Sequence, residues 1–159
     1  MAFDVSHLFS GLIGGLLTAG ANYLALRWRY RTDELAAFWT KTCDDVAAAA
    51  DLAAEYWLKD LSIALTEDAL RAIKADELRI IGHQARLTEM LAILDLEASK
   101  IDLLSLKPTF VDFFDALSGG DFQVEDRRAD FERARAVQYL GANLVVQLRK
   151  ALRRRTRLW

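Results

Sequence analysis

The sequence has little of the residues that build disulfide frameworks, metal sites and extended sheets. Its 159 residues include one cysteine, Cys43, one proline, Pro108, and two histidines 76 positions apart. A single cysteine excludes an internal disulfide, and without CxxC, HExxH or ExxH spacing there is no zinc or di-iron ligand pattern. No P-loop, nucleophile elbow or dinucleotide fingerprint is present. We therefore predict no metal and no cofactor.

Charge is absent from residues 5–26, VSHLFSGLIGGLLTAGANYLAL. As a helix these 22 residues rise about 33 Å, enough to cross a hydrocarbon core of about 30 Å. No Lys or Arg precedes the run, which predicts an outside N-terminus and a cytoplasmic body in a bacterial inner membrane. A cleaved signal peptide and a buried soluble helix are the alternatives. The missing positive charge before the run opposes the first. Residues 1–31 thus form the predicted transmembrane segment and its interface, and the membrane-interface residues are Arg27, Trp28, Arg29, Tyr30 and Arg31.

Small residues follow one stripe of this predicted span. Gly11, Gly15, Ala19 and Asn22 are spaced at i, i+4, i+8 and i+11. Small side chains allow helices to approach closely in lipid, and an asparagine facing lipid is costly. The stripe therefore predicts contact with another copy of the chain or with an aqueous lumen.

The basic residues gather at the two ends of an acidic body. Residues 32–148 hold 12 Lys or Arg against 22 Asp or Glu, although the whole chain has a net charge of only −2. The C-terminal end is basic and closes on a tryptophan, which predicts contact with anionic lipid head groups at the membrane surface. The acidic body argues against nucleic acid as the partner. The residues assigned to this surface are Arg153, Arg154, Arg155, Arg157 and Trp159.

Hydrophobic periodicity predicts an all-α body of about four helices over residues 32–159, with alternating directions. The first helix continues from the span, the second starts near Thr66, the third starts at Pro108 and ends at Gly119 or Gly120, and the last covers about residues 129–155. Its cap is either Asp126 or Asp130. The expected inward residues of the first helix are Leu35, Phe38, Trp39, Thr42, Val46, Ala49, Ala53 and Tyr56 or Trp57. Those of the second are Leu70, Ile73, Leu78, Ile81, Ala85, Leu87 or Thr88, Leu91, Leu94 and Ala98. The third and fourth contribute Phe110, Phe113 or Phe114, Leu117, Val137, Leu140, Leu144, Leu148 and Leu152.

The string Gly119-Gly120-Asp121-Phe122 is one residue short of the GG-D/E-E-F signature of diguanylate cyclases. In those enzymes the glycines lie in a β-hairpin, whereas here the string separates two predicted helices. We interpret it as a helix-ending turn with a glycine in the left-handed conformation. Alternating helix directions place this acidic turn far from the membrane, where a cytoplasmic partner protein could dock.

Arg79 and His83 are the candidate catalytic pair, because residues four apart share one helix face. A histidine that carries a proton and an arginine that stabilises phosphate charge can cleave RNA. This pair resembles the one in HEPN ribonucleases, although three residues separate it here and that family has four to six. A polar bundle position or an interface is the other interpretation.

The span, the helical body and the Arg…His pair together resemble small membrane-anchored antiviral effectors of bacteria, such as the accessory membrane pore proteins of type VI CRISPR systems. That resemblance is architectural and implies ring-like assembly, a membrane pore and a degenerate HEPN-like bundle. We therefore expect a non-catalytic, oligomeric membrane effector. A membrane-anchored adaptor for a cytoplasmic partner is the alternative, and an anchored ribonuclease is a third.

Overall fold

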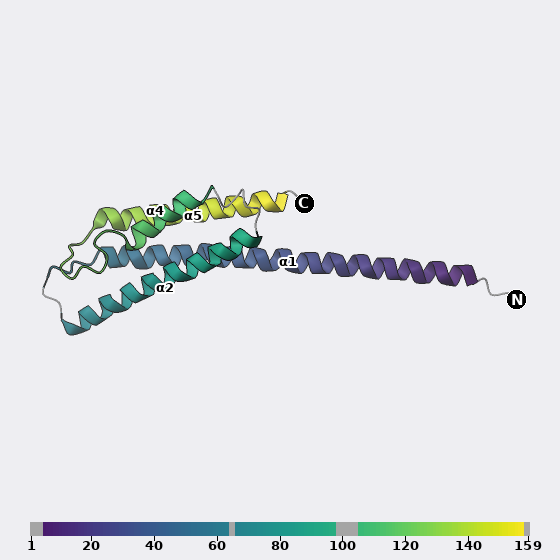
Figure 1. Cartoon of the computed structure of the whole chain (residues 1–159), viewed down its shortest axis with the longest axis horizontal. Coiled ribbons are helices and arrows are strands. Elements are labelled where there is room, and N and C mark those ends of the chain that lie inside the picture. Colours follow the sequence, from purple (N-terminus) through teal and green to yellow (C-terminus); the bar gives the residue numbers. More distant parts are fainter. Residues whose placement is uncertain (1–4, 64–65, 98–104, 158–159) are drawn as a thin grey trace. The chain divides into compact units, whose positions relative to one another are not determined.

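The computed structural model describes residues 5–63, 66–97 and 105–157, and it describes side chains for residues 18–63, 66–94 and 105–154. Within these ranges the chain forms four helices and no strand, which confirms the predicted all-α helical bundle (Figure 1). The helices are α1 (Val5–Trp57), α2 (Glu67–Glu97), α4 (Lys107–Ser118) and α5 (Phe131–Arg157).

The longest helix, α1, runs without interruption for 53 residues (Figure 1). No proline or glycine occurs after Gly20 in it, so nothing in that part of its sequence forces a break. The chain divides into two compact units within this helix, Met1–Phe38 and Trp39–Trp159. In the part of the chain that the structure describes, no helix has both the length and the apolarity that crossing a membrane requires.

Within the second unit, successive helices run in opposite directions. Between α5 and the Trp39–Trp57 part of α1, the contacts join opposite ends: Trp39 Nε1 donates to Leu148 O at 2.8 Å, and Asp130 N, just before α5, donates to Trp57 O at 2.8 Å. Two ion pairs show that α2 also runs opposite to α1. Lys59, just after α1, pairs with Asp76 at 2.6 Å, and Asp45, earlier in the chain, pairs with Arg86, later in α2, at 2.9 Å. In α4 and α5, Arg133 contacts Asp115 and Gln147 contacts Thr109. The predicted alternation of helix directions is confirmed.

The core of the second unit lies where α1, α4 and α5 meet. Most of the inward residues predicted for these helices are buried, whereas Leu35, Phe38, Leu140 and Leu152 are half-buried. Gly141 of α5 allows the close approach of its neighbours, because a Cβ atom there would meet Ala50 Cβ at 2.8 Å and a Phe113 ring carbon at 3.3 Å. The fully buried large side chains in these helices are Trp39, Val46, Tyr56, Trp57, Phe113, Leu117, Val137, Leu144 and Leu148.

The predicted inward face of α2 is partly wrong. Leu78 and Ile81 are exposed, by 69% and 41%, whereas Ile80, one position away on the helix, is 1% exposed. Apolar residues occur on both sides of α2, so periodicity alone selects no single face. The buried side includes Glu77, a residue that hydrophobicity would place outside. The apolar residues buried from this helix are Ile73, Ile80, Leu87, Met90 and Leu94; Leu70 and Ala85 are exposed, and Ala98 lies outside the described residues.

Helix ends form where the sequence supplies caps. Thr66 Oγ1 accepts a hydrogen bond from Ala69 N at 3.3 Å at the start of α2, and Pro108 occupies the first turn of α4. At the start of α5, Asp130 Oδ1 accepts a hydrogen bond from Arg133 N at 2.8 Å. Of the two predicted caps for this helix, Asp130 is the one used.

Candidate functional site

The turn between α4 and α5, residues 119–130, depends on two glycines. Gly120 has a φ of +59°, the left-handed conformation that favours glycine, and a Cβ there would lie 2.8 Å from an Arg133 guanidinium nitrogen. Gly119 N donates to Asp115 O at 2.7 Å, and a Cβ on Gly119 would lie 2.6 Å from that same oxygen. The string that resembles a cyclase signature is therefore a helix-ending turn, as predicted.

Arg127 connects this turn to the C-terminal end of α1 through hydrogen bonds. Its side chain is 4% exposed and donates to Tyr56 O at 2.9 Å and to Trp57 O at 3.3 Å. The last carbonyl groups of a helix have no partner within it and carry partial negative charge, so a buried guanidinium satisfies them well. The Arg127 backbone also takes part, because Leu61 N donates to Arg127 O at 2.8 Å. Arg127 thus caps α1 and holds the α4–α5 turn against the end of that helix. We call this contact between the end of α1 and the turn the joint.

Trp57 lies between two arginine side chains. The guanidinium carbons of Arg127 and Arg133 are 4.7 Å and 4.8 Å from the centroid of the Trp57 ring, within cation–π range. The indole N–H donates to Ala116 O at 3.1 Å and Leu117 O at 3.2 Å, which satisfies carbonyl groups at the end of α4. The ends of α1 and α4 are therefore joined through a single buried indole.

Tyr56 connects the same joint to α2. Its hydroxyl donates to Glu77 Oε1 at 3.2 Å and accepts a hydrogen bond from Gln123 N at 3.2 Å. Burial raises the pKa of the Tyr56 phenol, so it remains a neutral donor near neutral pH. The Glu77 carboxylate is also paired with Lys74 at 3.2 Å, and Phe122 packs on Tyr56 with ring centroids 5.2 Å apart. Glu77 is thus buried with its charge and its hydrogen-bonding capacity partnered.

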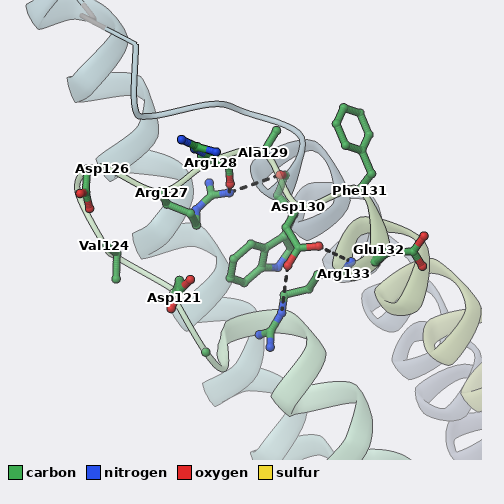
Figure 2. A pocket seen from close by; sticks show the side chains of 12 residues that line it. Asp121, Val124, Asp126, Arg127, Arg128, Ala129, Asp130, Phe131, Glu132 and Arg133 are labelled. Carbon is green, nitrogen blue, oxygen red and sulfur yellow. Dashed lines mark hydrogen bonds and ion pairs between the residues drawn. The ribbon is translucent and has the colours of Figure 1, made fainter.

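An open pocket of about 850 Å³ lies between this joint and the first turn of α5 (Figure 2). Trp57 lines it from the end of α1, and Asp121 and Val124 line it from the turn. Phe131, at the start of α5, is 70% exposed and points away from the joint in Figure 2. The charged lining residues are Asp121, Asp126, Arg127, Arg128, Asp130, Glu132 and Arg133. Carboxylates and guanidinium groups beside aromatic rings are suited to binding a polar, charged partner surface; the lining contains no histidine, cysteine or serine to act as base or nucleophile.

Of the four residues predicted to form a partner-docking turn, Gly120 and Asp121 line this pocket. Phe122 instead packs inward on Tyr56 and Trp57, and Gly119 accepts a short hydrogen bond from Arg133. Sequence reasoning missed Arg127 and Arg133, which organise the turn. Both occur among acidic residues in EDRRADFER, and the pattern does not distinguish them from solvated arginines.

The candidate catalytic residues make separate contacts. Arg79 is 67% exposed at its side chain and pairs with Asp76 at 3.3 Å. His83 Nδ1 lies 2.9 Å from Arg86 Nη2, and that same guanidinium nitrogen lies 2.9 Å from Asp45 Oδ1. Because arginine has only donors, Nδ1 is the acceptor and the ring is neutral.

The pKa of His83 agrees with this arrangement. Burial lowers that pKa, the charges of Arg86 and Arg79 lower it further, and Asp45 opposes them. Arg79 therefore acts on His83 through its charge, while Arg86 holds the hydrogen bond. Among the described residues, no group of three or more His, Cys, Asp or Glu side chains is arranged to hold a metal ion.

The predicted membrane residues that the structure describes are exposed. Every residue from Thr18 to Glu34 is exposed, including Ala19, Asn22 and the interface residues 27–31. Arg153 and Arg154 are exposed in the last turns of α5. The side chains of Gly11, Gly15, Arg155, Arg157 and Trp159 lie outside those that the structure describes.

Comparison with known proteins gave no match: no family model, no curated protein and no solved structure is similar to this chain.

Proposed function

We propose that this chain is a membrane-anchored helical protein, in which the first part of α1 is embedded in lipid and the bundle serves as a cytoplasmic module. One observation carries the proposal: from Thr18 to Leu26 every residue of α1 is exposed and none is charged. Tyr23, Leu24 and Leu26 are 63%, 65% and 56% exposed, and they end a run of 22 residues without charge. A helix that is apolar all round requires a non-aqueous surrounding. The run begins at residues 5–17, whose side chains lie outside those that the structure describes. For these residues the support for a span comes from the sequence alone.

The residues after the run support the orientation of this anchor. Trp28 and Tyr30 are 53% and 70% exposed and alternate with three arginines, the composition found where a helix leaves the membrane. The hydroxyl of Thr32, directly after these residues, donates to Arg29 O at 2.8 Å, a hydrogen bond within the helix. In the bundle, the hydrogen bond from Trp39 Nε1 to Leu148 O places the last turns of α5, which carry Arg153 and Arg154, beside Trp39 of α1. Basic residues there would bind anionic head groups.

We further propose that several copies assemble through the anchor and open or disturb the membrane, as an antiviral effector of bacteria would. Support comes from Asn22, an exposed polar residue that follows Gly11, Gly15 and Ala19 along one stripe. A stripe of this kind lets helices pack closely and gives the polar amide a partner or water instead of lipid.

Depolarisation of bacteria that express the full chain tests this function. Gly15→Leu and Asn22→Leu should abolish depolarisation, because each removes the small or polar character of the stripe. Tyr23→Leu, one residue away and off the stripe, is the matched control and should depolarise like the parent. If all three variants behave like the parent, the assembly of the anchor into a pore is wrong.

A second candidate function is an adaptor that binds a cytoplasmic protein at the α4–α5 turn. The pocket there, with Phe131 70% exposed at its rim, favours this reading. An adaptor needs only to be held at the membrane, so replacing residues 5–26 with an unrelated poly-Leu anchor would preserve its function. The same replacement would eliminate a pore lined by that segment.

A further inference from the structure

The outward side of α2 carries an apolar surface that the bundle does not use. We define the α2 outer stripe as Ala75, Leu78, Ile81, Gly82 and Ala85, residues that share one side of the helix at three- and four-residue steps. All five are exposed, and Leu78 is the most exposed of the large apolar side chains on this helix, at 69%. A contiguous apolar stripe on a helix that already buries its opposite side is typical of an interaction surface.

We propose that the α2 outer stripe binds the same stripe of a second copy, with the two helices antiparallel. A symmetric dimer requires one patch that is complementary to itself. Placing the two-fold axis between Ile81 and Gly82 sets Ile81 of one copy against Gly82 of the other, and Leu78 against Ala85. Each bulky side chain then faces a small one, which lets the two helices approach closely.

The space around Gly82 fits this arrangement. A Cβ atom on Gly82 would have no atom within 4 Å, so no contact within the described chain explains a glycine there. A glycine in the middle of a helix is less favourable than an alanine there. Close approach of a second helix gives the glycine a role that the single chain does not.

Charge supports the same register. The axis that matches Leu78 with Ala85 also matches Lys74 with Glu89 of the other copy, so each end of the stripe receives an opposite charge. Lys74 is 55% exposed at its side chain while it pairs with Glu77, and no ion pair joins Glu89 to another described residue. A parallel pairing would instead set Lys74 against Lys74 and Leu78 against Leu78.

This contact goes beyond the proposed membrane anchor and does not require it, because it uses only side chains of α2. Cross-linking of the full chain in mild detergent tests it, in a Cys43→Ala background that leaves one introduced thiol. With about 1.5 Å of rise per residue, an antiparallel pair brings position 81 of the two copies to nearly the same level, whereas positions 75 lie about 20 Å apart. Under an added oxidant, Ile81→Cys, which leaves Gly82 in place, should form at least tenfold more disulfide-linked dimer than Ala75→Cys.

A second substitution keeps the stripe distinct from association through the anchor. Adding Ala85→Glu to the Ile81→Cys chain should lower the yield of linked dimer at least tenfold, whereas adding Ala72→Glu, the same change at an exposed position off the stripe, should alter it less than twofold. Circular dichroism should show unchanged helix content, because both sites are exposed. Equal linking at positions 75 and 81, no linking at 81, or no effect of Ala85→Glu would each overturn the proposal. If the copies associated only through the anchor, the chain would still migrate as an oligomer, but cross-linking would give one of these three results.

Discussion

The two parts of α1 differ in what surrounds them, although they belong to one unbroken helix. From Trp39 to Trp57 the helix has one side buried in the bundle, and Trp39, Val46 and Trp57 are each at most 1% exposed. From Thr18 to Glu34 every residue is exposed. Helix-forming residues without a proline account for the continuity of both parts, whereas burial depends on partners elsewhere. The second part has such partners in α4 and α5.

The comparison separates two kinds of stabilisation. The bundle part depends on contacts with residues distant in the sequence, above all the hydrogen bonds that Arg127 donates to Tyr56 O and Trp57 O. The N-terminal part would depend on lipid or on other copies, according to our proposal. Substitutions in the two parts should therefore have different effects on the unfolding of the bundle.

The largest expected effect is at Arg127. Arg127→Met keeps most of the side-chain volume but removes the donors to Tyr56 O and Trp57 O, and hydrogen bonds from a charged group contribute about 1.5–3 kcal/mol each. We expect the free energy of unfolding of the bundle to fall by about 3 kcal/mol, measured by urea titration in detergent. Arg29→Met, in the N-terminal part of α1, should leave the urea midpoint unchanged. Equal losses for both variants would mean that the two parts are not independent.

A second test adds one methyl group to a glycine in each part. Gly141→Ala should destabilise the bundle by about 2 kcal/mol, because the new Cβ would lie 2.8 Å from Ala50 Cβ. A Cβ at Gly20 meets no atom within 4 Å, so Gly20→Ala should not lower the urea midpoint. A neutral Gly141→Ala would show that α1 and α5 do not pack this closely.

Thiol reactivity distinguishes the two parts without changing the core. Cys43 is 2% exposed and burial raises the pKa of its thiol, so we expect it to react with a maleimide at least 100-fold more slowly than a free cysteine. Tyr30→Cys in a Cys43→Ala background, at a position that is 70% exposed, should react quickly in detergent. Fast labelling of Cys43 in the folded parent would contradict the packing of α1 in the bundle.

The smallest expected effect is a pH dependence that comes from His83. Its pKa is lowered in the folded chain, so below the ordinary value of about 6.5 the unfolded chain binds a proton first. Stability should therefore fall as the pH decreases through this value, and the loss should stop growing below the folded pKa. Thermal unfolding at pH 7.5 and 5.5 should show a smaller decrease for His83→Gln than for the parent. An equal decrease in the two chains would show that His83 is not the source of the pH dependence.

Much of this fold could be predicted from the sequence because its helix signals are local. Thr66, Pro108, Gly120 and Asp130 mark helix ends through their own backbone and side-chain chemistry. The buried face of α2 could not be predicted, because apolar residues lie on both sides of that helix and the buried side includes Glu77. Its partner Tyr56 is 21 positions away, and no local pattern joins the two.

The candidate site was harder to predict than the helices. The glycine string identified where the turn lies, but the residues that hold it there are Arg127 and Arg133, through carbonyl groups of α1, α4 and the turn. Such contacts depend on how helix ends meet in space. In the pair chosen from sequence, Arg79 had the right spacing to reach His83, yet Arg86 donates the hydrogen bond, because Asp45 of α1 holds it beside the ring.

Alkaline carbonate extraction of bacterial membranes that contain the full chain tests the central claim most directly. Carbonate releases proteins held by surface charge and leaves those with a helix embedded in the hydrocarbon core. We predict that the parent chain stays with the membrane pellet. The triple variant Leu12→Asp, Leu16→Asp, Leu24→Asp should be released into the supernatant while its bundle remains folded. Release of the parent chain into the supernatant would contradict the membrane anchor.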